Sequence, residues 1–433
     1  MKNKFPVLSA FMLVAGFSVL TACASDSLKV TAPVTVKPDA DNAGLKLPAG
    51  FGALIVAENT GRPRHIVVNA QGDIFIKLAR AEKGKGVLLL KDSNGDGKAD
   101  ITTGMGNYGG TGITIKNGYL YASSDEAVFR YKLNEKNEVI DPGKPETIVT
   151  GLKKGQHPSK SIVLDNDHHL YVNIGAYSNS CQEMDRTKGS KGKMPCPVLD
   201  DAAGIWQFSA DKLNQTQAEG VRYGTGIRNV VGLDWNQQTN SLFVMQHGRD
   251  QLHDNWPEYF DEKQSAELPA ECMYEIKPGA NNAGWPYIYY DQIQHKKMLA
   301  PEYGGDGKKE GGKDAIDPVV AFPGHMAPDG LLFYTGNMFP EKYKNGAFVA
   351  FHGSWNRAPL PQEGYYVVFV PFKNGKPSGD WEVFADGFSG LPKVSSPGEA
   401  KHRPCGLAQG PDGSLYVTDD AKGAVYRIIY NGK

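Results

Sequence analysis

The 433-residue chain predicts an all-β fold, a six-bladed β-propeller, on three observations. A strand–turn–strand pattern occurs six times, the turn-forming residues Gly (51) and Pro (27) are abundant, and no long amphipathic helix pattern interrupts the series. Short strands separated by Gly, Asp and Asn turns and repeated along a chain indicate a radial β array. A ring of blades protects its sheet edges by closing on itself.

The N-terminus predicts export. Lys2 and Lys4 are followed by an apolar stretch over residues 7–20 and then by Thr21-Ala22-Cys23. This order is typical of a secretory signal, and the stretch is shorter than the roughly 20 residues that span a membrane. The ending resembles a bacterial lipobox, so we expect residues 1–22 to be a lipoprotein signal peptide and Cys23 to carry a membrane anchor. Because Ala24 follows, we expect the periplasmic face of the outer membrane; the alternative is a soluble exported protein.

Residues 23–47 are rich in Ala, Pro, Val, Lys and Asp without apolar periodicity, which predicts a tether. Residues 48–433 then form the propeller domain. The net charge of −1 and the lack of a long basic run argue against a nucleic-acid partner.

The repeats place the strands in order. The six copies begin at Arg64, Thr111, His157, Arg228, Pro328 and Arg403. A third strand is expected over residues 128–133, 205–208, 273–276, 366–370 and 425–429. Residues 51–58 precede the first copy and have a strand pattern, and we expect them to complete the last blade as its outer strand.

Basic residues gather at the heads of these copies. In a propeller the innermost strand of each blade starts near the central channel, so Arg64, His157, Arg228 and Arg403 are expected to converge. Close positive charges repel one another, and a polyanion would relieve the repulsion. The alternative is that each arginine pairs with an acid or caps carbonyl groups. Taken together, the heads predict a polyanion site.

Five motifs carry a family resemblance: Gly226-Ile-Arg-Asn, Gln246-His-Gly-Arg-Asp, Asn282-Ala-Gly-Trp-Pro-Tyr, His352-Gly-Ser-Trp-Asn-Arg and Arg403-Pro. In their order and spacing the chain resembles the quinoprotein sugar dehydrogenases of the soluble glucose dehydrogenase and L-sorbosone/pyranose dehydrogenase type. The resemblance implies a propeller that binds pyrroloquinoline quinone (PQQ) with calcium. It also implies oxidation of an aldose or sugar aldehyde.

The resemblance implies roles for individual residues. The catalytic residues are His157, as the base, and Arg228. The cofactor-binding residues are Arg64, Arg228, Asn229, Trp355, Asn356, Arg357 and Arg403. The metal residues are His247, Gly248 and Asp250, in a loop whose backbone oxygens hold calcium.

General chemistry agrees with these roles. Arginine forks suit the carboxylates of PQQ, and calcium is a hard cation that takes oxygen ligands. An ordinary histidine is mostly neutral at pH 7 and accepts a proton. The alternative for His157 is a turn histidine that only bonds the backbone, which is what we expect of His168 and His169.

Two further patterns concern local structure. Cys181 and Cys196 bracket a Lys/Gly-rich loop, and a disulfide there would contribute about 3 kcal/mol. A bridge between Cys272 and Cys405 is also open. Residues 92–100 alternate oxygen side chains as calcium loops do, but they lack the glutamate at the twelfth position, so we expect a hairpin loop with peripheral calcium as the alternative.

Two other functions remain open. A calcium-dependent propeller lactonase needs acidic and asparagine ligands at the strand heads. A non-catalytic propeller lipoprotein would keep the fold without chemistry. The chain has no C-x-x-C-H haem motif, so a dehydrogenase would need an external electron acceptor.

Overall fold

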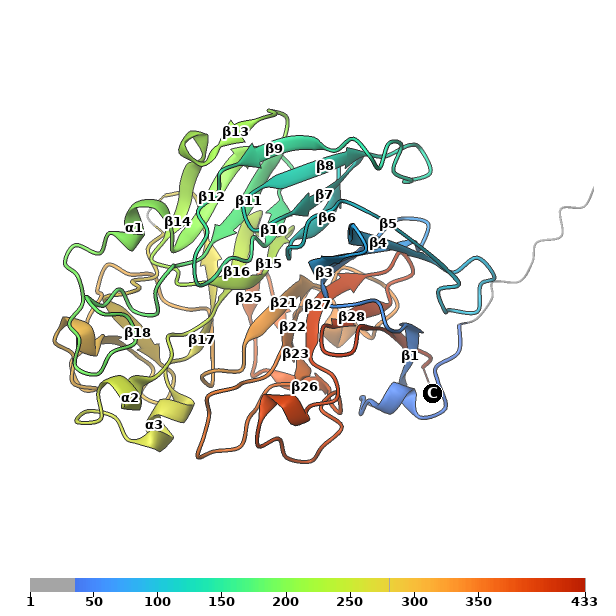
Figure 1. Ribbon diagram of the computed structural model, residues 1–433. Coiled ribbons are helices and arrows are strands. Elements are labelled where there is room, and N and C mark those ends of the chain that lie inside the picture. Colours follow the sequence, from blue (N-terminus) through green and yellow to red (C-terminus); the bar gives the residue numbers. More distant parts are fainter. Residues whose placement is uncertain (1–35, 280, 433) are drawn as a thin grey trace, which may run out of the picture. The chain divides into compact units, whose positions relative to one another are not determined.

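The computed structural model describes residues 36–279 and 281–432, which form six blade sheets of mostly antiparallel strands and two short hairpins (Figure 1). The strands of the first blade, from the channel outward, are β2 (Pro63–Val68), β3 (Ile74–Glu82), β4 (Lys85–Lys91) and β5 (Ile101–Met105). Those of the second are β6 (Ile113–Lys116), β7 (Tyr119–Ser123), β8 (Val128–Lys132) and β9 (Glu146–Thr150), with β13 (Gln215–Thr216) added parallel to β9. Those of the third are β10 (Ile162–Leu164), β11 (His169–Ile174), β12 (Gly204–Ser209) and β14 (Val221–Thr225).

The remaining blades follow the same plan. The fourth has β15 (Val230–Asn236), β16 (Ser241–Gln246), β17 (Glu271–Ile276) and β20 (Val320–Phe322). The fifth has β21 (Pro328–Phe333), β22 (Ala347–Phe351), β23 (Tyr366–Val370) and β26 (Glu382–Ala385). The sixth has β27 (Pro404–Gln409), β28 (Leu415–Asp419), β29 (Ala424–Tyr430) and β1 (Phe51–Ala57).

Short elements lie between the blade strands. They are the hairpins β18 (Ile288–Asp291) with β19 (Lys296–Leu299) and β24 (Phe372–Lys373) with β25 (Lys376–Pro377), and the helices α1 (Val198–Asp201), α2 (Leu252–Asn255) and α3 (Glu262–Glu267).

The ring closes through its first and last strands. The innermost strands contact one another in the order β2, β6, β10, β15, β21, β27 and back to β2. Strand β1 pairs antiparallel with β29, with Phe51 opposite Tyr430, and Figure 1 shows it beside the C-terminal strands. The six-bladed propeller and the outer position of β1 are therefore confirmed.

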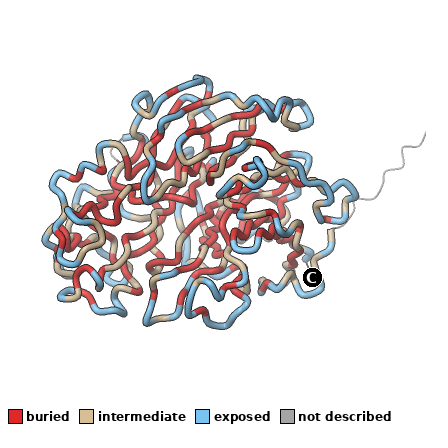
Figure 2. The backbone as a smooth tube through the Cα atoms, in the orientation of Figure 1, coloured by how far each residue is buried: buried red, intermediate tan, exposed pale blue. Residues whose placement is uncertain are grey.

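Apolar strands hold the blades together because each sheet is covered on both faces by its neighbours. All five residues of β22 are buried, so the strand is continuously apolar instead of alternating. Figure 2 shows buried segments in the blade strands and exposed segments mainly in the connecting loops. The innermost strands line a channel cavity of about 240 Å³, in which apolar residues such as Ile66 and Leu331 lie beside polar residues such as Thr114, Asp234 and Gln409.

The predicted tether is wrong for residues 36–47. The amide of Asp39 donates to Ala53 O at 2.8 Å, and a carboxylate oxygen of Asp39 accepts from the amide of Ile55 at 2.9 Å. Lys46 forms a β-bridge with Asp386, and Leu45 is 5% exposed. Side-chain caps and backbone bonds therefore fix this polar segment against blades five and six.

The predicted signal peptide (residues 1–22), the anchor at Cys23 and the first part of the tether lie outside the described residues. Within residues 36–279 and 281–432, no helix is long and apolar enough to cross a membrane.

The cysteine predictions have different outcomes. The disulfide between Cys181 and Cys196 is confirmed. Cys272 and Cys405 are unbonded and buried, so a bridge between them is wrong. Cys272 lies in β17 of blade four and Cys405 in β27 of blade six, with blade five between them.

In the loop between β4 and β5, the carboxylate oxygens of Asp92 and Asp100 accept hydrogen bonds from the loop itself. Asp92 accepts the amides of Gly95 and Gly97, at 2.7 and 2.8 Å, and Asp100 accepts the amide and the hydroxyl of Ser93. The expected connection between blade strands is confirmed, and these carboxylates serve as turn acceptors.

Candidate active site

The strand heads meet in two groups of polar side chains. The first joins blades one, five and six through Arg64, Asp329 and Asp420. The second joins blades three and four through His157 and Arg228. His247 connects the groups, because its amide donates to Asn229 O at 2.9 Å and its imidazole Nε2 lies 3.3 Å from Asp329 Oδ1.

His157 is held in one tautomer. Its Nδ1 lies 2.5 Å from the carbonyl oxygen of Ala176, which can only accept, so Nδ1 carries the hydrogen and Nε2 keeps its lone pair. The amide of Ala176 in turn donates to Arg228 O at 2.7 Å. A single residue therefore links the histidine of blade three to the arginine of blade four.

The environment of His157 keeps its ring neutral. Burial first, and the positive charge of Arg228 second, lower the pKa of His157 from 6.5 to about 3. A neutral imidazole with a free Nε2 can accept a proton at physiological pH.

Gly175 permits the close approach of His157 and Asn229. A Cβ atom at Gly175 would lie 2.7 Å from the Cβ of His157 and 2.7 Å from the Oδ1 of Asn229. Such distances are sterically forbidden, so the absence of a side chain at this position lets the two residues pack together.

The Arg228 guanidinium is almost completely engaged. Its Nε donates to Asn179 O at 3.0 Å, its Nη1 to Gly248 O at 2.8 Å, and its Nη2 to both Asn179 Oδ1 at 2.9 Å and Asp250 Oδ2 at 3.0 Å. Because a guanidinium has five N–H bonds, one N–H on Nη1 remains for a ligand.

Arg64 belongs to an ionic cluster instead of standing free. Its Nη2 lies 2.9 Å from Asp329 Oδ2, and its Nη1 lies 2.9 Å from Asp420 Oδ2. His352 Nε2 lies 2.6 Å from the other oxygen of Asp420. Burial alone would raise the pKa of Asp329 and Asp420, but their cationic neighbours, Arg64 among them, lower both pKa values far below the usual range.

The expectation of uncompensated cations is therefore wrong for three arginines. Arg64 and Arg228 pair with aspartates, and Arg357 pairs with Glu267 at 2.7 Å while its Nη1 donates to backbone carbonyls. The physical reason is that a buried guanidinium needs acceptors to offset its lost hydration. Arg357 thus anchors its own loop and is not part of the two groups at the strand heads.

Arg403 is the exception among these arginines. Its Nε donates to His352 O at 3.0 Å and its Nη2 donates to Gly353 O at 2.7 Å. Within residues 36–279 and 281–432, no carboxylate lies within ion-pair distance of its guanidinium. Arg403 therefore has three N–H donors left for a ligand.

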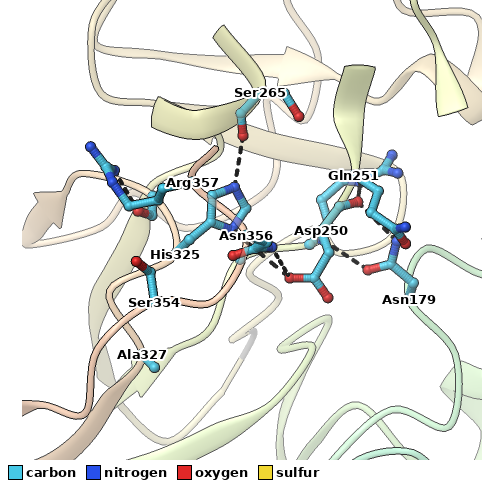
Figure 3. Close-up of polar contacts among 12 residues, drawn as sticks. Asn179, Asp250, Gln251, Ser265, His325, Ala327, Ser354, Asn356 and Arg357 are labelled. Atoms are coloured by element: carbon cyan, nitrogen blue, oxygen red, sulfur yellow. Dashed lines mark hydrogen bonds and ion pairs between the residues drawn. The ribbon is translucent and has the colours of Figure 1, made fainter. Parts of the chain in front are cut away.

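The three predicted metal residues have other partners. Gly248 O accepts from Arg228, and the imidazole of His247 faces Asp329 and Pro328 O. The carboxylate of Asp250, expected in the metal set, accepts from Arg228 and Arg186. It also accepts from Asn356, as Figure 3 shows. Its carboxylate oxygens are thus bonded to protein donors, and the expected metal role of this loop stays a prediction.

The loop around these residues leaves little room. A cavity of about 20 Å³, enough for one water molecule, lies beside Arg228 and residues 246–249. Within the described residues, no group of three His, Cys, Asp or Glu side chains could hold a metal ion. A cation here would depend on backbone oxygens, as the resemblance implies.

Trp355 and Asn356 lie in the loop that follows β22. Trp355 is 56% exposed. Asn356 Nδ2 donates to Asp250 Oδ1 at 2.9 Å, and its buried Oδ1 has no partner among the residues that the structure describes. Asn356 and Arg228 therefore both donate to the carboxylate of Asp250, and Asn356 Oδ1 remains available as an acceptor.

Sequence reasoning missed several partners in the site. They are Ala176, Asn179, Arg186, Asp329, Asp420 and His352 in its ionic role. Only Asp329, at the head of β21, occupied a position that could have identified it from the sequence.

A model of the TrAA12-like family matches residues 45–431. The chain belongs to the TrAA12-like family. It is 22% identical to the "Pyrroloquinoline quinone-dependent sugar dehydrogenase" of Hypocrea jecorina, over 97% of this chain and 95% of that protein. The resemblance to PQQ-dependent sugar dehydrogenases is thereby confirmed.

Two solved structures share the fold. The holo PQQ domain of pyranose dehydrogenase from Coprinopsis cinerea is 21% identical with a TM-score of 0.69, covering 89% of this chain and 97% of that domain. The calcium structure of a Trichoderma reesei family AA12 enzyme is 19% identical with a TM-score of 0.72, covering 92% of this chain and 99% of the other.

Proposed function

We propose that this protein is a PQQ-dependent dehydrogenase that oxidises an aldose or sugar aldehyde of the pyranose or sorbosone type and passes electrons to an external acceptor. Family membership and the name of the Hypocrea jecorina relative support the cofactor and substrate class. One observation carries the catalytic part: His157 presents a neutral ring with a free Nε2, linked through Ala176 to Arg228.

The strand heads fit a carboxylate-bearing cofactor in their donor chemistry. PQQ carries three carboxylates, and when bound it supplies the quinone that accepts hydride. Arg403 offers three N–H donors and has no carboxylate partner in the described part of the chain, and Arg228 offers one N–H. Charge-assisted hydrogen bonds of this kind each contribute about 1.5–3 kcal/mol.

Backbone oxygens near His247 and Gly248 would hold the calcium ion. A hard cation of this kind prefers six to eight oxygens and can polarise a carbonyl group. Asp250 is excluded from this set in our proposal, because its carboxylate already accepts three hydrogen bonds.

His157 moves the proton in the proposed reaction. Its Nε2 accepts the proton of the sugar hydroxyl while Nδ1–H stays bonded to Ala176 O, which fixes the ring plane. The exposed ring of Trp355 offers an apolar face to the C–H surface of a sugar.

Reconstitution tests the proposal. Purified apoprotein is mixed with PQQ and calcium, and dye reduction is followed with aldoses and sugar aldehydes. We expect reduction that requires both additions, that is lost in His157→Ala and that persists in the matched control His168→Ala, a turn histidine 49% exposed at its side chain. Quinone binding without turnover would favour a binding protein, and no quinone binding would favour the lactonase; either result refutes the dehydrogenase.

We further propose an exported lipoprotein anchored through Cys23 on the periplasmic face of the outer membrane. Its support is the basic, apolar and small-residue order of residues 1–23. Labelled palmitate should enter the wild type and not Cys23→Ser. Equal labelling of the two proteins would refute the anchor.

A further inference from the structure

We propose that Asp250 is a positioning residue, which fixes the Arg228 guanidinium and ties it to two loops. One is the disulfide loop (residues 181–196), and the other is the tryptophan loop (residues 352–363). The role in catalysis rests on the proposed function, whereas the tie between the loops is a property of the protein alone.

Both carboxylate oxygens of Asp250 are committed. Oδ2 accepts from Arg228 Nη2 at 3.0 Å and from Arg186 Nη2 of the disulfide loop at 3.0 Å. Oδ1 accepts from Asn356 Nδ2 of the tryptophan loop at 2.9 Å (Figure 3). One side chain therefore joins the head of blade four to loops from blades three and five.

The backbone of Asp250 is held as firmly as its side chain. Its amide donates to Asn179 Oδ1 at 2.9 Å, and its carbonyl oxygen accepts from Asn179 Nδ2 at 3.0 Å. Asn179 Oδ1 also accepts from Arg228. The arginine is therefore bound by Asn179 and Asp250, which are hydrogen-bonded to each other.

Charge makes the contact strong. The Arg228 and Arg186 guanidinium groups each lie 3.0 Å from Asp250 Oδ2, and a hydrogen bond between charged groups is roughly twice as strong as one between neutral groups. Two guanidinium groups share Oδ2. An asparagine would remove the charge and would turn an acceptor into an NH₂ group that repels one of the arginines.

His325 fixes the amide of Asn356 from the other side. The Nε2 of His325 faces two carbonyl oxygens, Ser265 O at 2.8 Å and Leu268 O at 3.0 Å, so Nε2 carries the hydrogen. In a neutral ring Nδ1 is then an acceptor, and it lies 3.3 Å from Asn356 Nδ2 and 3.8 Å from Asp250 Oδ1. With acceptors on two sides, the NH₂ group of Asn356 can only point toward Asp250 and His325.

This arrangement has a consequence for the site. The free N–H of Arg228 is oriented by the four acceptor atoms that hold the rest of its guanidinium. They belong to Asn179, Gly248 and Asp250, and of these three residues Asp250 alone is charged. Displacement of either loop would shift Asp250 and with it the donor. Misplacement of a reacting group by about 1 Å can lower turnover by about a hundredfold.

The test compares Asp250→Asn and Arg186→Gln with the matched control Asp254→Asn, an exposed aspartate of α2. Each protein is reconstituted with PQQ, and kcat, KM and the calcium concentration for half-maximal activity are measured. We expect Asp250→Asn to lower kcat by about 10- to 100-fold with little change in calcium requirement, and the control to match the wild type.

A second measurement uses the apoprotein. Trypsin can cut the disulfide loop after its exposed lysines Lys188, Lys191 and Lys193. We expect faster cleavage there in Asp250→Asn and Arg186→Gln, and no change in Asp254→Asn.

The two measurements separate the possible failures. A raised calcium requirement with unchanged cleavage would make Asp250 a metal ligand and overturn the inference, as would unchanged kcat and cleavage. If the wild type neither binds PQQ nor turns over, the proposed function fails, and the trypsin result alone decides whether Asp250 ties the loops.

Discussion

Replacing His157 by glutamine should change how the stability of the apoprotein depends on pH. The folded protein keeps the pKa of His157 at about 3, below the ordinary value of 6.5 that applies when the chain is unfolded. Between these values the unfolded chain binds a proton that the folded chain does not. The free energy of unfolding therefore falls as the pH drops through 6.5 toward 3.

The size of the effect follows from the pKa difference. At pH 5, which is 1.5 units below the unfolded pKa of 6.5, protonation of His157 in the unfolded chain lowers the free energy of unfolding by about 2 kcal/mol. At pH 8 this contribution is close to zero. The free energy of unfolding of the wild type minus that of His157→Gln should thus fall by about 2 kcal/mol from pH 8 to pH 5. Other titrating groups are present in both proteins and cancel.

Urea unfolding of both proteins at pH 8 and pH 5 measures this difference. The same pKa predicts that turnover of the reconstituted enzyme has no acid limb from His157 near pH 6.5. NMR titration of the His157 ring, assigned by its absence in the variant, checks the pKa directly. An unchanged stability difference between the two pH values, or a ring that titrates near 6.5, would refute the reasoning.

Three other changes test separate parts of the structure. Cys181→Ser opens the disulfide loop and should lower the free energy of unfolding by about 3 kcal/mol in urea, and equal midpoints with and without the bridge would contradict its role. Gly175→Ala places a methyl group 2.7 Å from His157 Cβ, so it should lower the turnover of the reconstituted enzyme; full activity would show that the site adapts. Arg403→Gln should weaken PQQ binding by about tenfold or more, measured by fluorescence titration, while the exposed control Lys401→Gln should not; equal affinities would remove Arg403 from the cofactor site.

The blade plan could be predicted because its signals are local. Each copy carries an alternating pattern on both sides of a Gly, Asp or Asn turn, and the third strands are apolar enough to recognise. Most outer strands were missed, because a segment such as β20 has only three residues and lies at the sheet edge. Strand β1 was the exception, since it is long and stands apart from the first copy.

The sequence predicted which basic residues lie at the strand heads, but it did not predict which acidic residues they pair with. The strand heads identified Arg64, His157, Arg228 and Arg403, because a propeller brings them to one end of the channel. Their acidic partners depend on contacts between distant parts of the chain. Arg64 and Asp420, for example, are 356 positions apart. Because these acidic partners could not be located from the sequence, the positive charge at the strand heads was overestimated. The family assignment therefore does not rest on the charge argument; it rests on the sequence motifs and on the family model that matches residues 45–431.

Ring closure by β1 has a mechanical consequence. If the protein is tethered upstream of residue 36, a pulling force reaches the propeller at the strand that seals it. The contacts of Asp39 with residues 53 and 55, and of Lys46 with Asp386, then bear the load before β1 does. A protease cut upstream of residue 36 would release an intact propeller. A truncation past residue 47 would instead remove the contacts of Asp39 and Lys46, so that a pulling force would act directly on β1.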